Sequence, residues 1–202
     1  MRVNEFVRCA SFPCSGVNHA GYIVPDVEID PEAVSIVLIS EAAPANHNDY
    51  YYAKGGSLFE LTTVQAFRDA GANVSSIQEI LSRGVYFTTA VKCAKIGYEI
   101  KAGPIKACSI LLEKEVSLFP NVKAYLLMGD VAIKAFNYLA FSLGEGRVIP
   151  AGSTYKIRGQ AYAFRGRRVF PSYLQAGPSF GIEISKRRMI AEDIAAALSL
   201  VE

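Results

Sequence analysis

The feature that most constrains the fold is a short apolar run that ends in a polar loop. Residues 36–39 read I-V-L-I, and three of the four are β-branched. A run this short and this apolar is typical of a strand that is buried on both faces, as at the centre of a parallel sheet. Because Pro44 cannot donate to a sheet ladder, we expect the chain to leave the sheet close to Glu41.

The polar loop after this run is a candidate ligand site. Its side chains are those of Glu41, Asn46, His47, Asn48 and Asp49. In open α/β sheets the ligand crevice lies beyond the carboxyl ends of the strands, which is where this loop would stand. A solvated loop without a function has a similar composition, so the pattern alone leaves both interpretations open.

Strand-like and helix-like segments alternate along the rest of the chain. Periodicity and turn residues predict strands over residues 36–39, 85–91, 122–128 and 167–170, the last stopping at Pro171, and a hairpin strand within 155–164. They predict helices over residues 58–70, 77–81, 104–119 and 131–141, a helical turn at 30–32, and a last helix from Ser185 to about Leu200. We therefore expect an α/β fold, a three-layer α/β/α sandwich with a central, mainly parallel four-stranded sheet.

Length and composition set broad limits. The chain has 202 residues, of which 51% are hydrophobic, enough for one domain with a sizeable core. No apolar run approaches the roughly 18 residues that cross a bilayer, and the first residues lack the apolar stretch of a signal peptide. We expect a single domain over residues 1–202 that is cytoplasmic and monomeric and has no membrane partner.

Basic residues gather in two segments although the net charge is only +2. The segments contain Lys156, Arg158, Arg165, Arg167 and Arg168, and then Lys186, Arg187 and Arg188. Such clusters are usually solvated faces, so they give only supporting evidence for a nucleic-acid partner.

The chain has four cysteines, which stand as two pairs far apart in the sequence: Cys9, Cys14, Cys93 and Cys108. A cytosolic protein keeps its thiols reduced, so two disulfides are not expected. Four thiolates can close one site for zinc or for an iron–sulfur cluster. On spacing alone, a cluster, a zinc ion and unrelated buried thiols all remain open.

Several segments taken together resemble the uracil-DNA glycosylase superfamily, most closely its iron–sulfur branches. Residues 43–47 read A-P-A-N-H, which is similar to a first motif Gly-Leu-Ala-Pro-Ala-x-His-Gly. Residues 88–93 read T-T-A-V-K-C, which is similar to the motif T-N-x-V-K-C. Residues 170–174 read F-P-S-Y-L, where the family has His-Pro-Ser followed by a Leu. The resemblance extends over about residues 8–195.

This resemblance implies a DNA glycosylase that excises a deaminated or damaged base, uracil or a related one, from DNA. It implies that the four cysteines hold a structural [4Fe–4S] cluster, with zinc as the alternative. It places the base next to Ala43, Pro44, Ala45, Tyr51, Phe59, Thr89 and Phe170, with Tyr51, or else Phe59, as the stacking ring. It assigns DNA contacts to Arg167, Arg168, Ser172, Tyr173, Leu174 and Gln175, with Leu174 as the apolar wedge.

The chain departs from the family at three functional positions. Phe170 stands in place of the His that stabilises the leaving base, and Thr89 stands in place of the Asn that reads uracil. Ala42 aligns with the Glu of the acidic branch, and Glu41 lies one position upstream, on the opposite face of a strand. The catalytic candidates are therefore Glu41, His47, Asn48 and Asp49.

These departures keep three functions open. The first is a glycosylase acting on a base that need not be uracil. The second is a DNA- or nucleotide-binding member that kept the scaffold and the cluster but lost efficient chemistry. The third is an α/β protein that binds a small nucleotide at its crevice.

Overall fold

A six-stranded mixed sheet forms the centre of the computed structural model, which describes residues 1–201. The strand order is β1-β3-β2-β4-β6-β5. The four central strands are parallel, and the two edge strands β1 and β5 pair antiparallel to their neighbours. The strands are β1 (Val17–Asn18), β2 (Ile36–Ala43), β3 (Val85–Lys95), β4 (Ala124–Met128), β5 (Tyr162–Phe164) and β6 (Arg167–Ser172).

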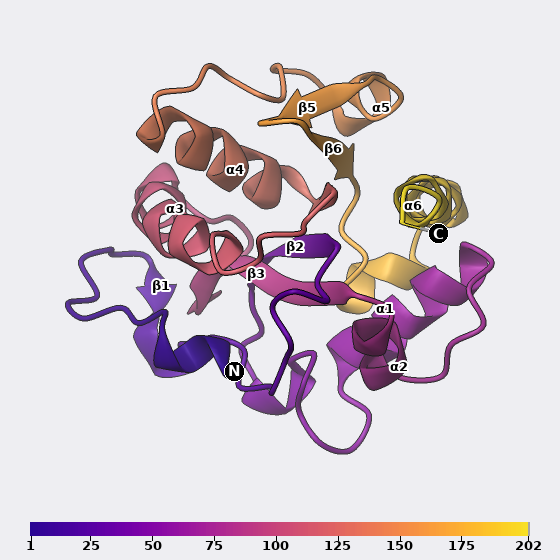
Figure 1. The fold of residues 1–202 in the computed structure, drawn as a ribbon. Helices are drawn as coiled ribbons and strands as arrows, with labels where there is room; N and C mark the ends of the chain where they lie inside the picture. Colours follow the sequence, from indigo (N-terminus) through magenta and orange to yellow (C-terminus); the bar gives the residue numbers. More distant parts are fainter. Residues whose placement is uncertain (202) are drawn as a thin grey trace.

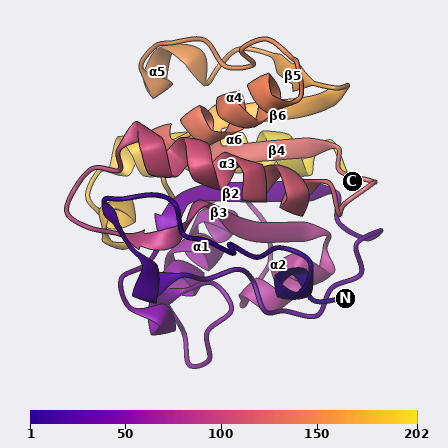
Figure 2. The same cartoon turned by 90° about the vertical axis from the view of Figure 1, so that its left-hand side faces the viewer.

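Helices cover both faces of this sheet (Figure 1). One layer holds α3 (Ala102–Val116) and α4 (Asp130–Ser142), and the other holds α1 (Leu58–Asp69), α2 (Ile77–Ser82) and α6 (Ile184–Leu198). Figure 2 shows α3 and α4 in front of the sheet and α6 behind it. The three-layer α/β/α prediction is thus confirmed, with two antiparallel edge strands added to the expected four. No helix within residues 1–201 is both long and apolar enough to span a membrane.

The apolar run at residues 36–39 is buried on both faces, as its sequence predicts. Val37 and Ile39 pack into the core on the α3–α4 side, and Ile36 and Leu38 pack into the core on the α1–α6 side. The strand continues to Ala43, farther than we expected, because only Pro44 ends its ladder.

Other predicted boundaries also differ from the structure: β3 extends to Lys95, β4 begins at Ala124, and α3 ends at Val116. β6 includes Pro171 and ends at Ser172, because β5 pairs only as far as Val169 and leaves an open edge where proline is tolerated. Residues 30–32 form a turn, in which the Asp30 side chain accepts the backbone N–H of Glu32, and not a helix. Ser185 lies inside α6, whose N-cap is Glu183.

The predicted hairpin strand over residues 155–164 is only partly present. Its first half forms a short helix, α5 (Thr154–Ile157), and its last three residues form β5. Arg158 follows α5 directly and binds both carboxylate oxygens of Asp193, which anchors this segment to α6. This long-range contact outweighs the extended tendency of the segment and is not visible in local periodicity.

Candidate active site and cysteine group

The motif segments meet at one edge of the sheet. The central strands are parallel, so their carboxyl ends lie together, at Ala43 in β2, Lys95 in β3, Met128 in β4 and Ser172 in β6. We call this the carboxyl edge. The A-P-A-N-H loop follows β2 there and the closing motif ends β6 there, so the topology brings the first and last motifs to one edge.

Glu41 lies near the end of β2, facing the N-terminus of α4. The backbone N–H of Val131 donates to its carboxylate at 3.4 Å. Gly129 leaves room for this side chain, since a Cβ there would stand 2.5 Å from Glu41 Oε1. Burial raises the pKa of Glu41, and the N–H of Val131 and the charge of Lys95 partly oppose this effect. Glu41 is therefore a partly buried carboxylate at a helix N-terminus.

The loop after Pro44 forms a 3-10 turn, His47–Asp49. Asn46 caps it by accepting the backbone N–H of Asn48. The exposed His47 ring lies with Nε2 3.1 Å from the carbonyl oxygen of Ala20, so it links the loop to the N-terminal segment. Asn48 is exposed and Asp49 is half-buried. Within residues 1–201, no hydrogen bond joins the side chains of His47, Asn48 or Asp49 to Glu41.

On the α1 side of the sheet, buried side chains form a polar network. Tyr51 bonds to Ser40 Oγ, and Gln175 Nε2 donates to Tyr51 Oη at 2.9 Å and to Thr63 Oγ1 at 3.3 Å. The Tyr51 ring is 1% exposed and meets Phe59, also buried, edge-on at 5.2 Å. Both aromatic rings that the resemblance offered for base stacking are therefore packed in the core.

Thr89 lies beside Ser40 in the sheet register and is wholly buried. Its Oγ1 has no hydrogen-bond partner within residues 1–201. A buried hydroxyl without a partner costs about 1–3 kcal/mol, so such an atom is a candidate for pairing with a ligand. The resemblance aligns Thr89 with the base-reading Asn, and Thr89 offers a single hydroxyl where an Asn offers a donor and an acceptor.

The closing motif is more deeply buried than a DNA contact would be. Phe170 is 8% exposed, with the Arg168 guanidinium 5.2 Å from its ring centroid. Ser172 is fully buried and donates to Asp193 at 2.5 Å. Gln175 is also fully buried, in the Tyr51 network. The side chains of Ser172 and Gln175 thus make hydrogen bonds inside the protein.

The two arginines at the start of β6 lie at the opposite edge. Arg168 pairs with Ala124 and Ser172 pairs with Met128, so β6 runs roughly 13 Å from the arginines to the carboxyl edge. The Arg167 guanidinium lies 3.4 Å from the Tyr125 hydroxyl. Arg167 and Arg168 therefore lie away from the edge that carries the motif loops.

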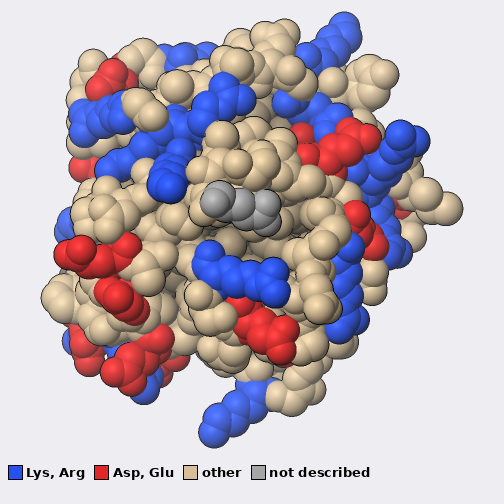
Figure 3. All heavy atoms as spheres, turned by 45° about the vertical axis from the view of Figure 1, so that its right-hand side comes forward, with Lys and Arg blue, Asp and Glu red and all other residues tan. Residues whose placement is uncertain are grey.

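The other basic group, residues 186–188, begins α6 and lies near the carboxyl edge. Arg187 is paired with Asp69, Lys186 with Glu183 and the largely exposed Arg188 with Glu192. Figure 3 shows one face of the molecule, on which Lys and Arg side chains are interspersed with those of Asp and Glu. No continuous positive surface covers that face.

Comparison with known families tests the resemblance noted in the sequence. The sequence matches the family model described as the uracil DNA glycosylase superfamily over residues 27–180. The chain belongs to the uracil DNA glycosylase superfamily. A comparison with curated proteins gave no match. The matched region contains the first motif, the T-T-A-V-K-C strand and the closing motif, and it begins after Cys9 and Cys14.

In this superfamily member, the four cysteines are close enough to influence one another's pKa. Cys93 and Cys108 are buried, Cys9 and Cys14 are half-buried, and all four are free thiols. Burial and, to a smaller extent, the other three thiols raise the pKa of the Cys93 thiol to about 12. His19 Nδ1 lies 3.4 Å from Cys93 Sγ, and Tyr22 accepts the backbone N–H of Cys9. Within residues 1–201, no three His, Cys, Asp or Glu side chains converge closely enough to hold a single metal ion.

Beside the cysteines, β3 carries a bulge. Ala42 pairs with Val91 but Ala43 pairs with Ala94, so Lys92 and Cys93 are extra residues in β3. Bulges re-aim side chains, and this one accompanies a Lys92 side chain that is wholly buried inside the molecule.

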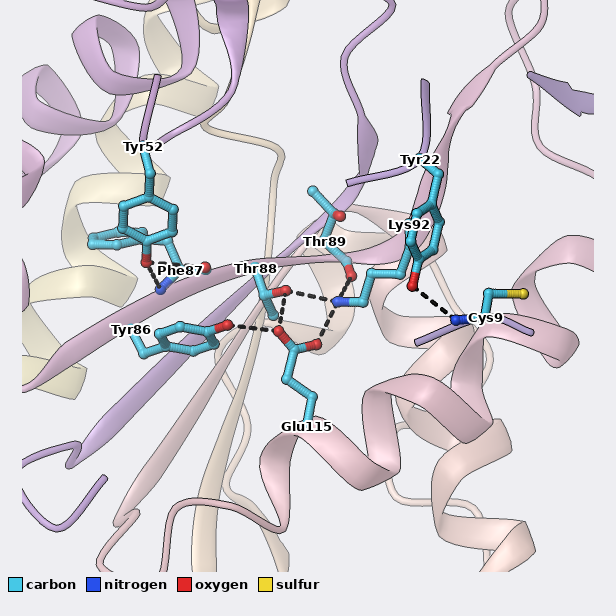
Figure 4. A network of polar contacts seen from close by, with 9 residues as sticks. All are labelled: Cys9, Tyr22, Tyr52, Tyr86, Phe87, Thr88, Thr89, Lys92 and Glu115. Atoms are coloured by element: carbon cyan, nitrogen blue, oxygen red, sulfur yellow. Dashed lines mark hydrogen bonds and ion pairs between the residues drawn. The ribbon is translucent and has the colours of Figure 1, made fainter. Parts of the chain in front are cut away.

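The Lys92 ammonium forms an ion pair with Glu115 of α3, which is equally buried (Figure 4). It also donates to Thr88 Oγ1 and to the carbonyl oxygen of Thr89, both at 2.7 Å. Glu115 accepts further hydrogen bonds from Tyr86 and Thr88. The pair thus links the strand segment that ends in Cys93 to the helix that bears Cys108. Our sequence reasoning missed it, because charged residues are normally interpreted as surface residues.

Proposed function

We propose that this superfamily member is a DNA glycosylase that hydrolyses the N-glycosidic bond of a deaminated or damaged base. Superfamily membership supports a glycosylase-like activity in general. The observation that carries the proposal is Glu41, a partly buried carboxylate at the carboxyl edge, facing a helix N-terminus and close to Lys95. A partly buried carboxylate with a raised pKa, at the carboxyl ends of parallel strands, is a candidate catalytic acid or base.

Cleavage of an N-glycosidic bond leaves positive charge on the sugar and negative charge on the base. The ionised Glu41 carboxylate would stabilise the sugar cation and take a proton from the attacking water. Its raised pKa makes it a stronger base than an exposed carboxylate. Asn48 is the loop donor available for the departing base, and Asp49 would orient the water. His47 would donate to the base only as the imidazolium, through Nδ1, because its Nε2–H faces the carbonyl oxygen of Ala20.

Thr89 would read the base, since its buried hydroxyl is free to pair with a polar atom of the base. A hydroxyl discriminates less than an amide because it makes fewer simultaneous hydrogen bonds. We therefore infer that the substrate class includes deaminated bases besides uracil. Introducing the family residue by Thr89→Asn should narrow excision toward uracil.

A panel of oligonucleotides, each with one altered base, tests the proposal. The readout is free base released under single-turnover conditions, on single and double strands. We expect release from at least one substrate, with an abasic site left in the DNA. Protein that binds these oligonucleotides but leaves every base in place would contradict the proposal.

That outcome would favour a second function, a DNA-binding member without efficient chemistry. The observation in its favour is Phe170, which stands where relatives have the His that stabilises the leaving base. Phe170 is buried, under the Arg168 guanidinium. It offers no hydrogen-bond donor to a departing anion.

We further propose that Cys9, Cys14, Cys93 and Cys108 hold a [4Fe–4S] cluster, with zinc as the alternative. A tetrahedral zinc site brings its sulfurs within roughly 4 Å of one another, since each Zn–S bond is about 2.3 Å. The four thiols influence one another's pKa but form no such tight group among the described residues. A [4Fe–4S] cluster takes four thiolates, each on a different iron, and so does not need its sulfurs in so tight a group. Its role would be to cross-link the N-terminal segment to β3 and α3.

Cys108→Ser tests the cluster. Protein purified without oxygen should be brown and contain about four iron and four sulfide ions per chain, and the variant should lose both. The matched control is Ser11→Ala, an exposed position between Cys9 and Cys14, which should keep its colour. Colourless wild-type protein with one zinc ion per chain would show that the zinc alternative is right.

The position of the basic residues predicts which charges contact DNA. Lys186→Gln combined with Arg188→Gln, at the carboxyl edge, should weaken DNA binding and lower the slope of log affinity against log salt by about 1–2. Arg167→Gln combined with Arg168→Gln, at the opposite edge, should leave both quantities unchanged. Fluorescence anisotropy titrations at several salt concentrations measure the slope. If the Arg167 and Arg168 changes weakened binding and the Lys186 and Arg188 changes did not, the DNA would bind at the amino ends of the parallel strands.

A further inference from the structure

The last residue of β6, Ser172, is held by hydrogen bonds at both its side chain and its backbone. Its hydroxyl donates to Asp193 of α6 at 2.5 Å, and its carbonyl oxygen accepts the backbone N–H of Gly129 at 3.0 Å. Gly129 is the N-cap of α4. Ser172 therefore connects α6, in one helix layer, to the beginning of α4, in the other layer.

Asp193 is held in turn by a guanidinium. Arg158 donates from Nε to Asp193 Oδ2 at 3.0 Å and from Nη2 to Asp193 Oδ1 at 2.8 Å, and the Ser172 hydroxyl shares Oδ2. Ser172 and Asp193 are buried. β5 pairs with β6 only as far as Val169, so within residues 1–201 the end of β6 has a strand partner, β4, on one side alone. The contact with Asp193 thus holds an end of β6 that the sheet holds only in part.

The Gly129 peptide forms a wall beside the Glu41 carboxylate. A Cβ at Gly129 would lie 2.5 Å from Glu41 Oε1 and 2.8 Å from its Cγ, and the residue has a φ of +100°. The next two N–H groups of α4, those of Asp130 and Val131, donate toward the same carboxylate and oppose the rise of its pKa. A displacement of Gly129 therefore changes how these N–H groups approach Glu41.

Two charged side chains act on Glu41 from neighbouring elements. Lys95, at the end of β3, lowers the pKa of Glu41, and Asp130, in the first turn of α4, raises it. Asp130 is paired with Lys134, one turn along the same helix. Ser172 carries no charge, so replacing it alters the pKa of Glu41 only by moving the groups around the carboxylate.

We propose that Ser172 is a positioning residue for the carboxylate of Glu41. Anchored by the Arg158–Asp193 pair, it fixes the Gly129 peptide and so keeps the N-terminus of α4 directed at Glu41. This assignment rests on the proposed glycosylase function, in which Glu41 carries the chemistry. Supporting hydrogen bonds of this kind hold a catalytic group in its productive geometry. The closing motif then serves the site from inside the protein, because its Ser172 hydroxyl is committed to Asp193.

The test is the pKa of Glu41 in the protein without DNA. NMR of protein labelled with ¹³Cδ-glutamate measures it, and Glu41→Gln assigns the resonance. Ser172→Ala should raise this pKa by about 0.5 or more, because the carboxylate loses well-placed N–H donors that favour its charged form. The pH profile of excision should move upward by the same amount. The matched control is Ser142→Ala, which removes a hydroxyl that donates to the Glu113 carboxylate at the other end of α4 and should leave the pKa of Glu41 unchanged.

A second variant keeps the test decisive if Ser172→Ala does not fold. Arg158→Lys preserves Ser172 and the positive charge but cannot bind both oxygens of Asp193 in the same way, so it should raise the pKa of Glu41 by a smaller amount. A pKa of Glu41 that stays unchanged in every folded variant, or that rises equally in Ser142→Ala, would overturn the assignment whatever the activity. If the pKa responds as expected but the wild-type protein excises no base, the positioning role stands and the proposed catalytic function fails.

Discussion

Replacing Lys92 with methionine should lower the free energy of unfolding by about 3–5 kcal/mol. The replacement leaves the Glu115 carboxylate fully buried without its cation, and the hydrogen bonds from Tyr86 and Thr88 do not neutralise a charge. Glu115→Leu alone should have a similar effect by stranding the Lys92 ammonium. The double variant Lys92→Met/Glu115→Leu removes both charges and should recover most of the loss.

Urea unfolding at matched metal content measures these differences. A change in midpoint without a change in slope reports stability itself. Lys134→Met is the control, because it breaks the exposed pair with Asp130 and should change stability by about 0.5 kcal/mol or less. A double variant as unstable as either single variant would show that packing around Lys92, and not the buried charge, carries the effect.

Glu41→Gln should slow excision by roughly two to three orders of magnitude while DNA affinity stays nearly unchanged. An amide keeps the shape of the side chain but can neither accept a proton at neutral pH nor stabilise a sugar cation by its charge. The control is Glu60→Gln, a carboxylate in the first turn of α1, which should keep wild-type rates. A tenfold effect or less would mean that another group supplies the catalytic charge.

The same variant should be more stable than wild type at neutral pH. Burial raises the pKa of Glu41 in the folded state, so folding favours its protonated form. This contribution is present below the pKa of the unfolded chain and is lost as pH rises through the higher folded pKa. The amide of the variant carries no charge, so the gain should be seen at pH 7 and vanish in acid. Thermal midpoints at both pH values measure it, and a variant less stable at pH 7 would contradict this sign.

The sequence predicts most of the element order, because each element carries its own local signal. The four apolar residues 36–39 suffice to place β2 at the centre of the sheet, and their burial on both faces follows from having no polar side. The helix over residues 58–70 is found within a residue because Ser57 caps it and Gly71 follows it at φ +92°. A hairpin strand was predicted in the segment that holds β5, but β1 was not predicted, because a strand of two residues has no periodic pattern.

The candidate site depends more on contacts between distant residues, and sequence patterns do not record these. Lys92 and Glu115 belong to different elements, so neither has a neighbour that predicts the buried pair. Arg167 and Arg168 are close to the closing motif in sequence, yet the length of β6 places them at the other end of the sheet. The sequence does not show which face of the sheet the Glu41 side chain occupies. The structure shows that it faces the N-terminus of α4.

The most direct test of this account is the pH dependence of single-turnover excision by the wild-type protein and by Glu41→Gln. We expect the wild-type rate to rise with pH through one ionisation whose pKa lies above that of an ordinary Glu carboxyl, because Glu41 must be charged to act and burial raises its pKa. The residual rate of the variant should lack this ionisation. A wild-type profile without it, or the same ionisation retained in Glu41→Gln, would show that Glu41 is not the catalytic carboxylate.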